Sequence, residues 1–168
     1  MKIVGSLMMI VGCWAVGYGM CSSHRRQIRA MEQLLLALEW MQWELNCNMP
    51  VLSRLCRGAS QQCSGSVSAV LRKLAEELEG QIVPHPAACM MAAMNAVPGL
   101  PAAAGEQLSL LGQSLGCFDL QGQLSALEAA GQRCGLVLEG LRRKQQEKAG
   151  NFQTLGICAG VALVILLL

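Results

Sequence analysis

Apolar residues recur every three or four positions through most of this chain, a spacing that places them on one side of an α-helix. The first helix is predicted to follow a cap at Ser22 or Ser23, with Asn48 and Pro50 marking the start of the next. Glycine and proline favour loops at 58–65, 80–86 and 98–101. Further helices are predicted at 51–57, 66–78, 87–97, 102–115 and 119–168.

The longest pattern runs from Asp119 to Leu168 and contains no proline. Its apolar stripe consists of Leu120, Leu124, Leu127, Cys134, Leu138 and Leu141. A basic collar follows, made of Arg142, Arg143, Lys144 and Lys148, and then an uncharged apolar tail. We therefore predict one helix, capped by Asp119, that starts in water and ends in lipid.

The N-terminal segment from Ile3 to Met20 is also apolar, and about 18 residues is close to the shortest membrane span. A cleaved signal peptide is the competing interpretation. It is disfavoured because Lys2 would be the only basic residue in the N-terminal region of the signal peptide, and because no small-x-small cleavage site precedes Cys21. Met20 likewise stands where a lipoprotein signal needs a small residue. We therefore predict an uncleaved anchor.

Basic residues flank both apolar ends on their inner sides: His24, Arg25, Arg26 and Arg29 follow the first, and the collar precedes the second. Positively charged flanks stay on the cytoplasmic side of a membrane. The prediction is an all-α protein with an N-terminal transmembrane anchor at 1–21, a cytoplasmic helical domain at 22–151 and a C-terminal transmembrane helix at 152–168. The domain is expected to contain about six helices.

Composition narrows the function classes. Hydrophobic residues make up 53% of the 168 residues and charged residues 14%. The net charge of +2 does not produce the strongly positive electrostatic field that attracts nucleic acid. The nine cysteines are odd in number and include no C-x-x-C pair, so free thiols in a reducing compartment are expected. The sequence contains no recognised catalytic, phosphate-binding or metal-ligand motif. We expect no enzyme activity, cofactor, metal or small-molecule substrate. We interpret His85 as a loop residue, and Trp40 and Trp43 as core or interface packing residues.

Gly156 and Gly160 form a G-x-x-x-G, a spacing that allows close helix approach in lipid. Antiparallel pairing from the cytoplasmic boundary places Gly156 opposite Gly17. Extending it places Met31 opposite Arg142 and Leu38 near Gly135. The two helices would form a hairpin stalk of about 25 residues each, or roughly 37 Å. Glycines 122, 131, 135 and 140 fit a close neighbour, although simple tolerance also explains them.

Several short stretches occur in an order and spacing that are specific when taken together. In the first part they are Arg26-Gln27-Ile28-Arg29, Ala37-Leu38-Glu39, Glu44, Pro50 and Leu52. In the last part they are Leu111-Gly112, Leu115-Gly116, Asp119, Gln123, Leu127-Glu128, Leu155-Gly156 and Gly160. Together they resemble the stage III sporulation protein AB family. The resemblance covers about 22–52 and 108–168, and the middle matches only in being helical.

The resemblance implies a scaffold in the mother-cell membrane around the forespore, within a channel-like complex, with a cytoplasmic domain similar to type II secretion platform proteins. It also implies other membrane components as partners, together with a secretion-type ATPase, stage III sporulation protein AA. Acidic residues far from lipid are the candidate docking patch: Glu39, Glu44, Asp119 and Glu128. Two alternatives remain open: a secretion or pilus platform outside sporulation, and a membrane-bound enzyme with an unrecognised site.

Overall fold

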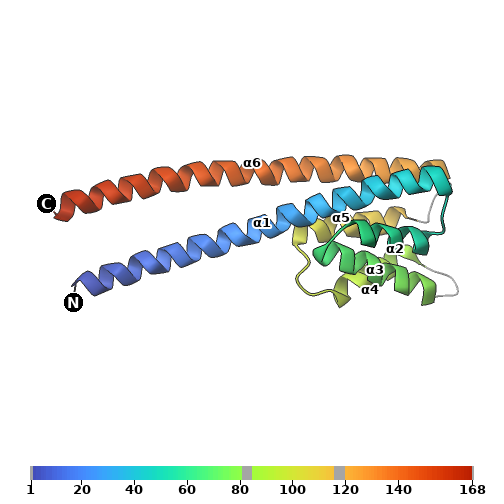
Figure 1. Ribbon diagram of the computed structural model, residues 1–168, viewed down its shortest axis with the longest axis horizontal. Coiled ribbons are helices and arrows are strands. Elements are labelled where there is room, and N and C mark those ends of the chain that lie inside the picture. The colour runs from blue at the N-terminus through green and yellow to red at the C-terminus, as the bar shows by residue number, and fades with distance from the viewer. Residues whose placement is uncertain (1, 81–84, 116–119, 168) are drawn as a thin grey trace.

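The computed structural model describes the backbone of residues 2–80, 85–115 and 120–167, and the side chains of residues 23–80, 85–115 and 121–146. These ranges form six helices and no strand, which confirms the all-α class (Figure 1). The helices are α1 (Lys2–Asn48), α2 (Leu52–Gln62), α3 (Gly65–Gly80), α4 (Pro86–Ala96), α5 (Ala102–Ser114) and α6 (Leu120–Leu167).

The two long helices, α1 and α6, run antiparallel, and the four short helices pack along one side of this pair (Figure 1). Each short helix contacts the next, and α1 contacts α2, α3, α5 and α6. The chain-terminal parts of α1 and α6 extend beyond the bundle in the same direction. The half of α1 that is farthest from the N-terminus, called the distal half below, is therefore the centre around which the bundle is assembled.

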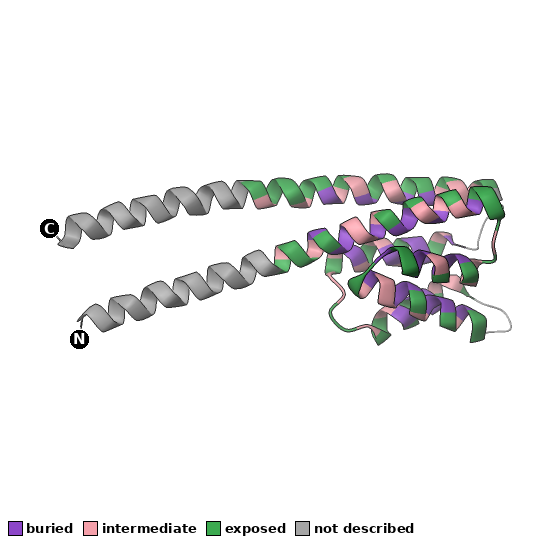
Figure 2. Cartoon of the chain, in the orientation of Figure 1, coloured by how far each residue is buried: buried purple, intermediate pink, exposed green. Residues whose placement is uncertain are grey.

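Apolar residues at helical spacing along α1 form much of the core (Figure 2). The buried ones are Ile28, Met31, Leu34, Leu38, Met41 and Leu45, while Leu35 is only partly buried. The apolar residues at the same spacing on α3 are all buried: Val67, Val70, Leu71, Leu74 and Leu78. Because burial of such side chains drives folding, the helical periodicity of the sequence determines which faces meet.

Three local predictions are wrong. Ser23 lies inside α1 and starts no helix, and Asn48 ends α1, where its amide donates to Glu44 at 3.1 Å instead of capping α2. The loop predicted at 58–65 is largely helical, since α2 continues to Gln62. The reason is Gly58: a Cβ there would lie 2.1 Å from Cη2 of Trp40, so glycine is what lets α2 approach α1. Trp40 is thus a packing residue, as predicted.

The connection from α1 to α2 is short and sharply bent. Met49 has a φ of 46°, in the left-handed region that residues other than glycine seldom adopt. Pro50 follows, and α2 then starts after Val51, whose carbonyl accepts a hydrogen bond from the Leu55 amide at 3.0 Å. The predicted cap at Asp119 and the predicted stop at Gly116 lie outside the described residues.

The predicted antiparallel register holds in the described part of the stalk. Arg142 donates to Glu32 at 2.6 Å, one residue from the predicted Met31–Arg142 pairing. A Cβ on Gly131 would lie 3.6 Å from Nε2 of Gln42, an ordinary contact. Gly135 has no atom within 4 Å of its Cβ position and neither has Gly140, so close approach does not explain these two glycines.

No helical stretch with described side chains is long and apolar enough to cross a membrane. Both predicted spans, 3–20 and 152–168, lie outside those residues, although helical backbone continues through them. Gly17, Gly156 and Gly160 lie in these two spans, so their pairing stays a prediction.

Candidate functional site

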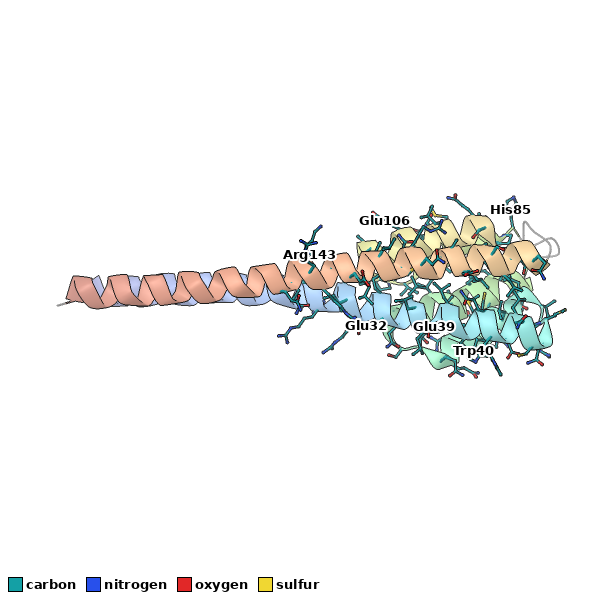
Figure 3. The ribbon with its side chains drawn as sticks, turned by 90° about the horizontal axis from the view of Figure 1, so that it is seen from above. Glu32, Glu39, Trp40, His85, Glu106 and Arg143 are labelled. Carbon is teal, nitrogen blue, oxygen red and sulfur yellow. The ribbon has the colours of Figure 1, made fainter. Side chains whose placement is uncertain are left out.

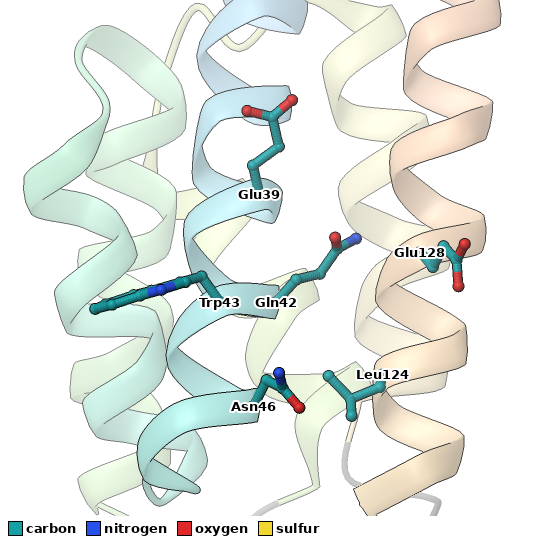
Figure 4. Close-up of a pocket in the computed structure, with 6 residues that line it drawn as sticks. All are labelled: Glu39, Gln42, Trp43, Asn46, Leu124 and Glu128. Atoms are coloured by element: carbon teal, nitrogen blue, oxygen red, sulfur yellow. The ribbon is translucent and has the colours of Figure 1, made fainter.

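An open groove runs between α1 and α6 on the distal half of the pair (Figure 4). It is lined by Glu39, Gln42, Trp43 and Asn46 from α1 and by Leu124 and Glu128 from α6. Two of the four predicted docking residues, Glu39 and Glu128, therefore lie in one site although they are far apart in the sequence.

Helix geometry explains why these side chains share the groove. On α1, positions 39, 42, 43 and 46 follow the spacing that brings residues to one face. The other side of α1 at this level carries the buried Met41 and Leu45, and α6 buries Leu127 next to Glu128. Burial of these apolar residues fixes the rotation of each helix, so the polar residues between them are held at the surface.

The two tryptophans have different surroundings. Trp40 is partly buried with its ring over Gly58, whereas Trp43 is 59% exposed. Trp43 forms the outer lip of the groove on α1, while Gln42 extends toward α6 (Figure 4). Of the two predicted roles, core packing therefore fails for Trp43, whose large apolar ring is in contact with solvent, and interface packing stays a prediction.

The groove carries negative charge that the described chain does not neutralise. Neither Glu39 nor Glu128 takes part in a hydrogen bond or ion pair with any described residue. Other glutamates do have partners: Glu79 accepts from Arg57 and Glu76 from Lys73, each at 2.7 Å. The groove thus combines unpaired carboxylates with an exposed aromatic ring.

The remaining predicted docking residues do not join this groove. Glu44 lies on the α2 side of α1, because it is four residues after Trp40, whose ring lies against Gly58 of α2. Its carboxylate accepts from Asn48. Asp119 lies outside the described residues. Sequence reasoning did not single out Gln42, Asn46 or Leu124 as groove residues, although their helical spacing from the named residues was available as a signal.

Metal-ligating residues and cysteines are the other candidates for chemistry among the described side chains. No group of three or more metal-ligating residues occurs among them. Burial raises the pKa of the Cys56 thiol to about 12 and that of Cys63 and Cys134 to about 11. A thiol with a raised pKa is a poor nucleophile, so these cysteines behave as small apolar residues. His85 is exposed and its side chain makes no capping bond to α4.

Comparison with known proteins agrees with the resemblance read from the sequence. The family model described as stage III sporulation protein AB matches residues 2–168. A solved structure titled "Stage III sporulation protein AB (SpoIIIAB)" is similar in fold, with a TM-score of 0.61 and 18% identity. The match covers 73% of this chain and 98% of that one. A search of curated proteins gives no match. Because the family model spans nearly the whole sequence, the chain belongs to the stage III sporulation protein AB family and has a role associated with sporulation.

Proposed function

We propose that this protein is a non-enzymatic membrane platform of the sporulation complex between mother cell and forespore. Both of its ends are anchored in the mother-cell membrane around the forespore, and its helical domain extends into the cytoplasm. In this role the domain engages the complex's secretion-type ATPase, stage III sporulation protein AA, while the anchors contact other membrane components and the bilayer.

The observation that carries this proposal is the shared direction of the two long helices. The chain-terminal parts of α1 and α6 leave the bundle side by side (Figure 1), and each carries one of the apolar sequences. Exposed basic residues lie on both helices where the bundle ends: Arg25, Arg26, Arg29, Arg142, Arg143 and Lys144. This distribution fits two adjacent helices entering one membrane with their positive flanks in the cytoplasm.

Topology is the first test. A reporter that is active only in the cytoplasm, inserted near Pro84, is expected to work, because the domain lies on the positively flanked side. Activity of a reporter that works only on the exported side would contradict the proposal. In a background without the native cysteines, the pair Gly17→Cys and Gly156→Cys is expected to crosslink. Gly5→Cys with Gly156→Cys serves as the mismatched control.

Co-purification from sporulating cells tests the partner. The full chain, extracted in mild detergent, is expected to retain the ATPase. Complete absence of the ATPase after chemical crosslinking in intact cells would overturn the platform role. A second comparison uses Glu39→Lys, Glu44→Lys and Glu128→Lys together: equal ATPase binding at low salt would rule out the acidic patch as the docking face.

A further inference from the structure

The outer side of α1 exposes two large apolar side chains, Trp43 in the lining of the groove and Leu36 beside it. Leu36 is 47% exposed and Trp43 is 59% exposed, and their spacing of seven residues places them on one face, two turns apart. Glu39 lies between them on the same outer side, and Leu124 and Glu128 form the opposite wall. Gln42 and Asn46 lie between the two walls (Figure 4), so the surface combines a carboxylate from each long helix with an exposed apolar edge on α1.

This combination is complementary to one kind of surface. An exposed tryptophan ring attracts a guanidinium or ammonium group over its face, and unpaired carboxylates strengthen that attraction. Leu36 and Leu124 add apolar contacts on either side of the charged centre. A helix lying along a groove presents its residues at the same three- and four-residue spacing as the groove itself. The matching occupant is a helix with one apolar face and basic residues beside it.

We propose that the groove between α1 and α6 receives a basic amphipathic helix of the secretion-type ATPase. One basic residue of that helix lies between Glu39 and Glu128, a second lies over the Trp43 ring on the other side of Glu39, and its apolar residues contact Leu36 and Leu124. This assignment rests on the proposed platform function and identifies the docking face for it.

A second copy of this chain is a poorer occupant. Two-fold pairing of grooves would bring each acidic wall against its own copy, which like charges oppose. The densest group of cations that another copy offers is the basic collar, and it lies beyond the bundle, as Arg143 shows in Figure 3, whereas Glu39 lies on the bundle. Arg54, Arg72 and Arg133 are further exposed cations on the described bundle, so an adduct between two copies is one of the outcomes that the test must distinguish. Arg29 and Trp43 are separated by about 21 Å along α1. Copies anchored in the same membrane hold their grooves at one height, so a groove does not meet a neighbour's collar.

Site-specific photo-crosslinking of the full chain in sporulating cells tests the assignment. Benzoylphenylalanine is placed at Trp43 in one strain and at Leu136 in another. Leu136 is 71% exposed and is not among the groove residues, so it is the matched control. The expected result is an adduct to the ATPase from position 43 but not from position 136, with mass spectrometry locating it in a helix rich in lysine or arginine.

The outcomes separate the groove from the wider function. An adduct to a second copy of the chain, or to another protein, would overturn the assignment of the ATPase helix to the groove. Equal adducts from positions 43 and 136 would do the same, because the contact would then not be specific to the groove. If the ATPase still co-purifies with the chain but crosslinks from neither position, the groove assignment fails while the platform function stands. If it does not co-purify at all, the platform function itself fails.

Charge reversal then tests the recognition chemistry. Glu39→Lys with Glu128→Lys is expected to weaken ATPase binding to the full chain at low salt by at least about tenfold. Glu77→Lys with Glu106→Lys changes the net charge equally on α3 and α5, and is expected to leave binding unchanged. Trp43→Ala is expected to weaken binding on the order of 30-fold, as for an aromatic residue at the centre of an interface. Reversing the crosslinked basic residue of the ATPase should restore binding to the groove variant. Equal loss in the two double variants, or no rescue, would refute the proposed pairing.

Discussion

Glycines distinguish the layer of short helices from the outer part of α6. In the short-helix layer, Gly58 and Gly112 lie where a side chain cannot fit: a Cβ on Gly112 would be 2.6 Å from Cβ of Met90. On α6, Gly135 and Gly140 have open space around their Cβ positions. The same residue type thus marks close helix packing in one region and an unpacked surface in the other. Packing in the first region holds the bundle together, which leaves the α1/α6 surface available for partners.

The largest expected difference comes from truncating one leucine in each region. Leu71→Ala on α3 removes a fully buried side chain and should lower the free energy of unfolding by about 2–5 kcal/mol. Leu136→Ala on α6 removes a side chain that is 71% exposed and should change it by less than about 0.5 kcal/mol. Urea titration of the full chain in mild detergent, followed by near-ultraviolet circular dichroism, measures both. Similar losses would mean that the outer face of α6 is part of a packed core.

The two kinds of glycine predict opposite changes in the free energy of unfolding when each is replaced by alanine. Gly112→Ala places a methyl group against Met90, whose Cβ is fixed to its backbone, so α4 and α5 must separate. Overpacking of this kind costs about 1–3 kcal/mol. Gly135→Ala meets no atom and should stabilise the chain by up to about 1 kcal/mol, since alanine favours helix. The same titration measures both variants. Stabilisation by Gly112→Ala would show that the two helices are not held this close.

Sequence periodicity predicted most of the fold because burial of an amphipathic face depends on local spacing. It failed at 58–65, where glycine in α2 is explained only by Trp40 on another helix. The predicted register placed Glu44, not Glu39, at the height of Glu128, whereas the groove brings Glu39 and Glu128 together and leaves Glu44 out. Five residues turn a helix by about 140°, so Glu44 points to a different side of α1. The groove could not be predicted from the sequence, because its lining depends on how α1 and α6 are rotated relative to each other.

The buried thiol of Cys56 predicts sensitivity to alkaline pH. Its pKa is about 12 in the folded chain because of burial, above its ordinary value of 9.0. The folded state therefore keeps a proton that the unfolded state releases as the pH rises above 9. The stability that the protonated Cys56 thiol contributes is complete below pH 9 and is lost progressively as the pH rises toward 12. Each unit in that window costs up to about 1.4 kcal/mol.

Urea titrations of the parent chain and Cys56→Ala at pH 8 and pH 10 measure this slope. Between pH 8 and pH 10 the free energy of unfolding of the parent should fall by about 1 kcal/mol more than that of Cys56→Ala, with each protein compared with itself at pH 8. Cys47→Ala is the control, because Cys47 is exposed. Equal slopes for the parent and Cys56→Ala would show that the thiol at position 56 is reached by solvent in the folded chain.

The smallest expected effect concerns the ion pair that joins the two long helices. Arg142 and Glu32 meet at 2.6 Å, but their side chains are 55% and 39% exposed. Water and salt screen such a pair, so its coupling energy should be only about 0.2–1 kcal/mol in a double-mutant cycle of Glu32→Gln and Arg142→Gln. The charge-swapped variant, Glu32→Arg with Arg142→Glu, should recover most of that coupling, because the two positions face each other whichever side carries the positive charge. Coupling that persists unchanged in high salt would indicate a packing contact in place of the ion pair. Zero coupling at low salt, together with no recovery in the swapped variant, would argue against the register that places Glu39 and Glu128 in one groove.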